Sequence, residues 1–465
     1  MNLKKTLNLA LLVFIGLLMG LFLCEVLLQT VPFISKNIPE NSKIKYVYVL
    51  GESSSYGIPY QGKISFAKII QYLTSNNIDN KDIKLINLSV PGHKLIHQYF
   101  RYFVYRYTHP FNKGILLLYV GTNELSYNKT SKYFYLFYKS NLLKIMSAYL
   151  NKFEDFYYRY ENIIKLAKFF GDDIYMSTIA GNYSDFSPDN VKKDKTVIND
   201  LINTDDLFFQ GKYNHALAFC LNNINNNNKS HVFYRIGKIY EKYGKIKEAN
   251  NFYIKAVDIN YGDTLRPSPR TDQNEIIKFL AHKYDIPLLD IFQKLYNSGE
   301  VIGSNFFIDK IHPTLRLNLM IADGFVDLMS KKYKINKVDS ALNEEKIKAI
   351  FNFTDMDLLI AYMQALGETM LCSYRSKILD RYALHKIQND IMLIKQLNLL
   401  PYGKIDEQKK TIEFLETILE YISSKNSQNT LKDKIKHIYY YGLDKNYSYS
   451  NDFNFNEMLK ENQII

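Results

Sequence analysis

The sequence predicts an α/β fold in which helices cover both faces of a parallel sheet. Short apolar segments of strand type alternate with helical patterns such as Phe66–Asn76 and His93–Tyr107, and this alternation is typical of parallel sheets. Small polar residues follow several of these segments, as expected where the carboxyl ends of strands form a ligand-binding edge. The predicted strands are Tyr46–Leu50, Leu85–Leu88, Ile115–Val120, Asp173–Ile179 and Ile286–Ile291.

The first predicted strand ends abruptly in small residues that carry hydroxyl groups. Gly51 and Glu52 precede three consecutive serines, Ser53, Ser54 and Ser55. This arrangement puts a serine at the carboxyl end of a buried strand. Taken alone, the segment is more typical of a turn or a helix cap.

Three later segments supply the other parts of a hydrolytic serine site. Gly92 ends the segment that follows the second strand, and Asn123 follows the third strand. Asp309 and His312 lie three residues apart far downstream, just before a helical pattern. Each segment alone has an ordinary explanation as a turn or helix start, but together they read as a nucleophile, oxyanion donors and an acid–base pair.

With these motifs the chain resembles the SGNH (GDSL-type) hydrolase family over residues 44–190 and 265–330. The resemblance implies a flavodoxin-like sheet of five parallel strands in the order 2-1-3-4-5. It implies Ser53 as nucleophile, His312 as base and Asp309 as its partner, with an oxyanion hole formed by Ser53, Gly92 and Asn123. It also implies that the loop after the fourth strand lines the substrate pocket, through Asn182 and Tyr183.

The chemistry explains these residue types. A serine hydroxyl is a poor nucleophile near neutral pH, so it needs an imidazole to accept its proton. The imidazole needs a carboxylate to hold its tautomer, and the developing oxyanion needs N–H donors. Glu52 and Glu124 occupy positions where the family usually has Asp; neither carries the reaction, although Glu52 can alter the electrostatics beside Ser53.

Composition excludes several other classes of function. The chain has 465 residues, a hydrophobic fraction of 47% and a formal net charge of +12, so it is long enough for two or three structural units. It has no Arg-rich patch or nucleic-acid motif, and no nucleic-acid partner is expected. His93 and His97 have helical i, i+4 spacing but lack a third metal ligand, so we expect no metal and no other cofactor.

The N-terminal segment predicts a membrane anchor. Leu7 to Leu28 is almost continuously apolar and follows Lys4 and Lys5, and its length suffices to cross a bilayer about 30 Å thick. No small-residue cleavage site follows it. The lysines favour an N-terminus inside and a catalytic domain outside the cytoplasm, in the periplasm or at the cell surface.

Two insertions and a C-terminal region extend this core. Residues 129–170 are rich in aromatic side chains, which would either pack on the sheet or form a surface for a membrane or acyl chain. Residues 200–262 resemble a tetratricopeptide-like (TPR-like) helical pair in which Gly237 and Ala249 allow close packing. This insert would roof the cleft, hold a partner protein, or serve only as structural elaboration. The C-terminal helical patterns are Leu358–Leu371, Lys377–Leu397 and Asp406–Ser423.

We therefore expect a membrane anchor (1–31), a hydrolase domain in two parts (42–199 and 263–333), a TPR-like insert (200–262) and a helical C-terminal region (334–465). Cys220 and Cys372 either pair or remain buried thiols. The expected function is that of a membrane-anchored extracytoplasmic serine esterase that cleaves O-acyl or O-acetyl bonds through an acyl–Ser53 intermediate. Envelope glycans and lipids are the natural ester substrates for that location. The alternatives are an O-acyltransferase on an envelope polysaccharide and a catalytically silent interaction scaffold.

Overall fold

The computed structural model describes residues 43–124, 156–188, 195–224, 229–259, 268–338, 342–375 and 381–398, together with scattered positions between 16 and 34. The predicted helix over 406–423 and the aromatic run over 133–138 lie outside the described residues, as does most of the predicted membrane anchor. Within the described part of the chain, no helix is both long enough and apolar enough to cross a membrane. The prediction of a single-pass anchored protein with an extracytoplasmic domain is corrected accordingly.

The centre of the fold is one sheet of six strands, with the order β2-β3-β1-β4-β5-β6. All neighbouring pairs are parallel except β2 with β3, which is antiparallel. The five predicted strands therefore have the expected order. The predicted number of strands is wrong, because the sheet has a sixth, short edge strand, β2. The strands are β1 (Ile44–Gly51), β2 (Asn77–Ile78), β3 (Lys81–Asn87), β4 (Gly114–Tyr119), β5 (Asp173–Ser177) and β6 (Leu288–Leu289).

Burial explains why β1 and β4 form the middle of the sheet. Every residue of β4 is buried, as are residues 47–51 of β1. Continuous apolar strands of this kind are typical of parallel sheets covered on both faces. Gly114 is the first residue of β4, and only a residue without a Cβ fits there, because a Cβ would lie 2.4 Å from the carbonyl oxygen of Tyr46 on β1.

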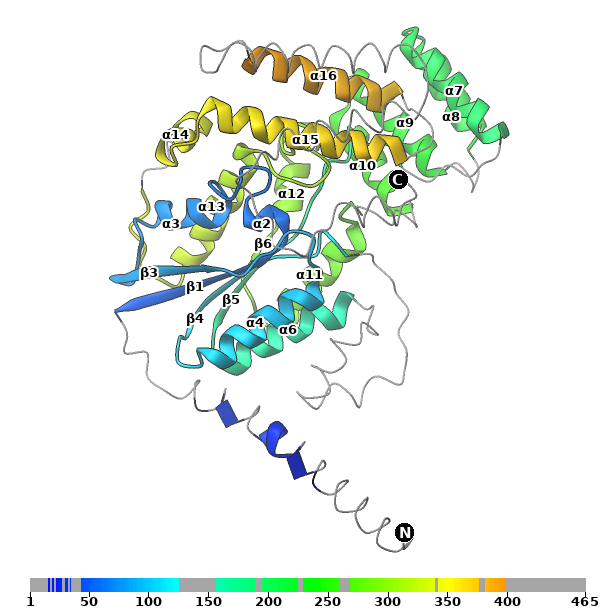
Figure 1. Cartoon of the computed structure of the whole chain (residues 1–465). Coiled ribbons are helices and arrows are strands. Elements are labelled where there is room, and N and C mark those ends of the chain that lie inside the picture. Colours follow the sequence, from blue (N-terminus) through cyan, green and yellow to red (C-terminus); the bar gives the residue numbers. More distant parts are fainter. Residues whose placement is uncertain are drawn as a thin grey trace, which may run out of the picture.

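Helices cover both faces of the sheet (Figure 1). One face is covered by α3 (Phe66–Leu73) and α13 (Leu315–Ser330), where the rings of Phe66 and Phe325 stack with centroids 6.0 Å apart. The other face is covered by α4 (Leu95–Thr108), α6 (Phe156–Phe170) and α11 (Thr271–Lys283). The sheet therefore leaves only its strand ends free to carry a site.

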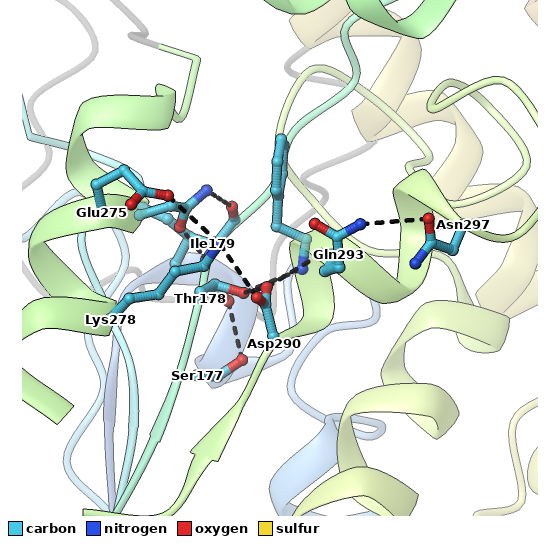
Figure 2. Close-up of polar contacts among 10 residues, drawn as sticks. Ser177, Thr178, Ile179, Glu275, Lys278, Asp290, Gln293 and Asn297 are labelled. Atoms are coloured by element: carbon cyan, nitrogen blue, oxygen red, sulfur yellow. Dashed lines mark hydrogen bonds and ion pairs between the residues drawn. The ribbon is translucent and has the colours of Figure 1, made fainter. Parts of the chain in front are cut away.

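The end of β5 is fixed by a polar network that Figure 2 shows. Thr178 donates its hydroxyl to Asp290 at 2.9 Å, and Asp290 also pairs with Lys278 of α11 at 3.2 Å. Asp290 caps α12 (Ile291–Tyr296) by accepting the Gln293 N–H. Because the helix begins at Ile291, the last strand is shorter than the predicted Ile286–Ile291.

Two further groups of helices lie beyond the sheet domain (Figure 1). The first follows β5 and comprises α7 (Lys195–Phe209), α8 (Tyr213–Asn222), α9 (Lys229–Lys242) and α10 (Ile246–Ile259). The second follows α13 and comprises α14 (Glu344–Ile350), α15 (Asp355–Arg375) and α16 (Arg381–Asn398). Lys63, which follows the short helix α2 (Ser53–Tyr56), pairs with Asp357 of α15 at 2.7 Å and ties this second group to the sheet domain.

Cys220 on α8 is a buried free thiol. The described structure therefore holds it outside any disulfide, and burial raises its pKa to about 11, which keeps the thiol protonated at neutral pH.

Candidate active site

Ser53 lies where β1 turns sharply into α2, at the carboxyl end of the central strand. The turn is tight because Gly51 lacks a Cβ, which would otherwise lie 1.8 Å from the hydroxyl oxygen of Ser55. Gly57 ends α2 with a φ of +105°, a backbone conformation that favours glycine. The small residues around Ser53 thus allow the tight turn from β1 into α2, and this turn positions the Ser53 hydroxyl.

The structure brings Ser53, His312 and Asp309 together in one chain of hydrogen bonds. The Nε2 atom of His312 lies 2.7 Å from the Ser53 hydroxyl, and its Nδ1 atom lies 2.6 Å from Oδ2 of Asp309. The three residues are 6%, 3% and 1% exposed. This is the geometry of a nucleophile, a base and an orienting carboxylate.

Asp309 is held as a carboxylate despite its burial. Burial alone would raise its pKa, but His312 and the backbone N–H groups of Ile311 and His312 outweigh that effect and keep the pKa of Asp309 below its usual value. The two N–H groups donate to Oδ1 at 2.9 and 2.8 Å, so Oδ2 remains for the imidazole.

The loop that carries Asp309 and His312 is fixed to the sheet domain. The Ser54 hydroxyl donates to the carbonyl of Ile311 at 3.3 Å, and the Tyr60 hydroxyl donates to the carbonyl of Pro313 at 3.1 Å. The residues next to Ser53 therefore position the segment that carries its partner.

Gly92 and Asn123 lie on the loops after β3 and β4. Gly92 has a φ of +74°, and open space surrounds the position of its missing Cβ. The Asn123 side-chain amide donates to the carbonyl of His93 at 3.1 Å, which connects the two loops. The hydrogen bonds of the described residues do not link either residue to Ser53, so the predicted oxyanion hole stays a prediction.

Two buried glutamates hold these loops, and the sequence did not assign them this role. Glu52 accepts hydrogen bonds from the Gly121 N–H and from the Thr122 hydroxyl, both at 2.7 Å. Burial raises the pKa of Glu52 to about 7, although these hydrogen bonds oppose the rise. Glu124 accepts from the Leu95 N–H at 2.6 Å.

Two residues outside the motifs complete this support. Arg159 of α6 pairs with Glu124 at 2.9 Å, and the Gln273 amide of α11 donates to the carbonyls of Gly121 and Glu124 at 3.3 and 3.1 Å. The sequence shows Arg159 and Gln273 only as polar side chains within helical patterns. Such a pattern does not identify a partner that is distant along the chain.

Asn182 and Tyr183 lie in the loop after β5, but their polar groups are used internally. The Asn182 amide donates to Asp185 at 2.9 Å, and its backbone N–H donates to the carbonyl of Lys310. The Tyr183 hydroxyl donates to the carbonyl of Pro269 at 3.0 Å. Both residues are buried, and their predicted substrate contact stays a prediction.

His93 lies just before α4 and His97 lies in its first turn, with ring centroids 4.9 Å apart. His93 precedes the helix, which begins at Leu95 rather than at the predicted His93. His97 Nδ1 accepts the Lys94 N–H at 3.1 Å. Among the described residues, no group of three His, Cys, Asp or Glu side chains is arranged to hold a metal ion.

No family model matches this chain, and no curated protein matches it. Eleven chains of solved structures do match. They include TesA (TM-score 0.30, 11% identity, covering 62% of this chain and 99% of that chain) and a lipase/acylhydrolase from Enterococcus faecalis (0.32, 10%, 63% and 100%). The esterase EstA from Pseudoalteromonas sp. has a TM-score of 0.27 and 12% identity, with 62% of this chain and 97% of that chain covered. These likenesses are too low to carry an argument, and the interpretation of the site depends on its geometry.

Proposed function

We propose that this protein is a serine esterase of SGNH type that cleaves ester bonds through an acyl–Ser53 intermediate. The observation that carries the proposal is the continuous contact from Ser53 through His312 to Asp309, with separations of 2.7 and 2.6 Å. A buried carboxylate beside an imidazole beside a serine hydroxyl is the arrangement that activates serine toward an acyl group.

In the first step, the Ser53 oxygen attacks the ester carbonyl while its proton moves to Nε2 of His312. Asp309 accepts the Nδ1–H of the imidazole, which keeps Nε2 free to receive that proton and stabilises the imidazolium. The tetrahedral intermediate collapses when His312 returns the proton to the departing alcohol. An acyl–Ser53 ester and a free alcohol result, with atoms and protons balanced.

In the second step, water replaces the alcohol. His312 removes a proton from the water, the resulting oxygen attacks the acyl–Ser53 carbonyl, and the proton passes to Ser53 as the acid departs. The proposed oxyanion donors are the N–H groups of Ser53 and Gly92 and the amide of Asn123, which has a second N–H besides the one it donates to His93. A hydroxyl of a glycan or another alcohol in place of water would give O-acyl transfer by the same chemistry.

The proposed helical insert is a TPR-like pair formed by α9 and α10. Its support is close packing at Gly237, where a Cβ would lie 2.6 Å from the ring of Tyr253. The rings of Tyr240 and Phe252 stack across the same pair with centroids 5.4 Å apart. We propose that residues 200–262 form this unit between the two parts of the hydrolase domain and that its function is to bind a protein partner.

The test is labelling of the purified full-length chain with a fluorophosphonate probe, in parallel with turnover of p-nitrophenyl acetate. We expect wild type to be labelled and Ser53→Ala to lose both labelling and turnover. Ser330→Ala is the control, because it removes an exposed hydroxyl at the end of α13 and should keep the label. A folded wild-type protein that takes no label, or a label that persists in Ser53→Ala, would overturn the proposal and favour an interaction scaffold.

A further inference from the structure

Glu52 is a buried carboxylate that directly precedes the proposed nucleophile. Its exposed fraction is 0%, and acids are seldom buried to this extent unless other groups bind them. The peptide bond after Glu52 carries the Ser53 N–H, one of the proposed oxyanion donors. The Glu52 side chain holds the loop that carries Asn123, another of these donors. One residue therefore connects two groups that the proposed mechanism directs at the same carbonyl.

The hydrogen bonds that the described residues make with the Glu52 carboxylate are all donated to it. Oε1 accepts the Gly121 N–H at 2.7 Å. Oε2 accepts the Thr122 hydroxyl at 2.7 Å and the Thr122 N–H at 3.4 Å. A backbone N–H can only donate, whereas a threonine hydroxyl can donate or accept. The arrangement therefore matches the ionised form of Glu52.

Protonation of Glu52 would disturb this arrangement. A proton on Oε1 would oppose the Gly121 N–H, so the neutral acid has to carry its proton on Oε2. From there the proton can be donated to the Thr122 hydroxyl, whose own hydrogen must then turn away and lose its acceptor. Thr122 is 1% exposed, so water does not readily replace that acceptor. The neutral acid therefore holds the loop after β4 less firmly than the carboxylate does.

The charged and titratable groups that face Glu52 come from β4, the loop after it and α6. Glu124 of the loop adds negative charge that raises the pKa of Glu52, and Arg159 of α6 pairs with Glu124 at 2.9 Å. The phenols of Tyr119 on β4 and Tyr160 on α6 also interact with Glu52. Burial raises the pKa of both phenols, so they stay neutral while Glu52 titrates.

The proposed base belongs to a separate set of contacts. Both ring nitrogens of His312 are in use, Nε2 with Ser53 at 2.7 Å and Nδ1 with Asp309 at 2.6 Å. No hydrogen bond of the described residues joins this imidazole to Glu52. The site therefore contains two titratable groups with different partners.

We propose that Glu52 is a positioning residue whose ionised carboxylate holds the loop of Asn123 in its active arrangement, so that the esterase requires two deprotonated groups, His312 and Glu52. The proposal rests on the proposed esterase function and adds pH control to that site. Because the pKa of Glu52 is about 7, its contribution to activity is present above that pH and is lost below it. The fold itself gains stability from the bound proton, so this loss of activity is not unfolding.

The test is the pH profile of kcat/KM for p-nitrophenyl acetate, measured with the full-length chain from pH 4.5 to 8.5. We expect the logarithm of kcat/KM to rise with a slope approaching two on the acid side in wild type, and with a slope of one in Glu52→Gln. The amide does not titrate and imitates the neutral acid, so kcat/KM at pH 8 should also fall about 10²–10³-fold, as for loss of one oxyanion donor. Glu275→Gln, at an exposed acid, is the control and should keep both the slope and the rate.

Two further variants test the route of the effect. Thr122→Val keeps the shape of the side chain but removes a hydrogen bond that lowers the pKa of Glu52, so the Glu52 transition should move to higher pH. This variant replaces Glu52→Gln if the latter does not fold. In an Asn123→Ala background, Glu52→Gln should reduce kcat/KM little further, because coupled residues are not additive.

The outcomes separate this proposal from the one beneath it. A wild-type slope of one, or a slope of two that persists in Glu52→Gln, overturns the role of Glu52. A lower rate with an unchanged slope shows a merely structural role and also overturns it, as does a full effect of Glu52→Gln in the Asn123→Ala background. In each of these cases fluorophosphonate labelling of Ser53 at pH 8 still supports an esterase. Absence of that labelling in wild type overturns both proposals.

Discussion

The buried carboxylate of Glu52 accepts the hydroxyl of Thr122 at 2.7 Å, so the residue before the proposed nucleophile holds the loop that carries Asn123. The same carboxylate accepts the Gly121 N–H. Glu52 therefore connects the turn that carries Ser53 to the loop that carries Asn123. In the proposed mechanism both segments contact the same substrate carbonyl. Since the Glu52 side chain is buried and titratable, its protonation is linked to the stability of the fold.

Glu52 should make the protein less stable as the pH rises. Its pKa increases from the ordinary value of 4.5 to about 7 in the folded chain. Between these values the folded state holds a proton that the unfolded state has lost, so the free energy of unfolding falls as the pH rises. The full effect is on the order of 3 kcal/mol. Glu52→Gln should remove this part of the slope in urea titrations from pH 4 to 8, whereas Glu275→Gln, at an exposed acid, should not.

Asp309→Asn should reduce kcat for p-nitrophenyl acetate by about 10³–10⁴-fold. The amide can still accept the N–H groups of Ile311 and His312 through its oxygen, so the loop should keep its shape. Its NH₂ group would then face Nδ1 of His312 and place the imidazole proton on Nε2, where it cannot accept the Ser53 proton. The exposed Asp327→Asn is the control. A rate close to that of wild type would contradict the assigned role.

Arg159→Ala should destabilise the fold by about 3–5 kcal/mol, because it leaves the buried carboxylate of Glu124 without its cation. Equilibrium unfolding in urea measures the change. Lys348→Ala breaks the pair with the exposed Glu345 and should cost less than about 1 kcal/mol. Equal losses in the two variants would show that the buried pair does not hold the loop.

Gly237→Ala should destabilise the α9–α10 pair by about 1–3 kcal/mol, because the added methyl group meets the ring of Tyr253. Lys242→Ala, at an exposed position of the same helix, should have little effect. Combining Gly237→Ala with Tyr253→Leu tests the cause, since the smaller side chain should restore part of the loss. Thermal unfolding of the three variants gives the comparison, and no recovery in the double variant would contradict steric overlap.

The positions of the main strands could be predicted because they are continuous apolar runs with distinct ends, whereas their order was implied by the resemblance to the SGNH family. The β4 segment Gly114–Tyr119 is the clearest example. Strand β2 could not be predicted, because it has only two residues and positive-φ turn residues flank it, Ser75 and Asn76 before it and Asp79 and Asn80 after it. A strand of that length has no periodicity, and its pairing with β3 comes from the turn between them.

The grouping of Ser53, Asp309 and His312 followed from motif and chain order, because each segment stands where a strand ends or a helix begins. The supporting residues could not be found this way. Arg159 lies 35 positions from Glu124, and Glu52 lies 70 positions from Thr122. Such pairs depend on how distant helices and loops meet.

The separation of Ser53 and His312 has a consequence for synthesis. The two residues that touch at the site are 259 positions apart, so a ribosome working at about 5–20 residues per second makes the base about 13–50 s after the nucleophile. Throughout that interval the nascent chain carries Ser53 without the imidazole of His312. If the proposed mechanism holds, products that terminate within residues 200–262 would be inert, and activity would arise only after the segment that carries His312 emerges.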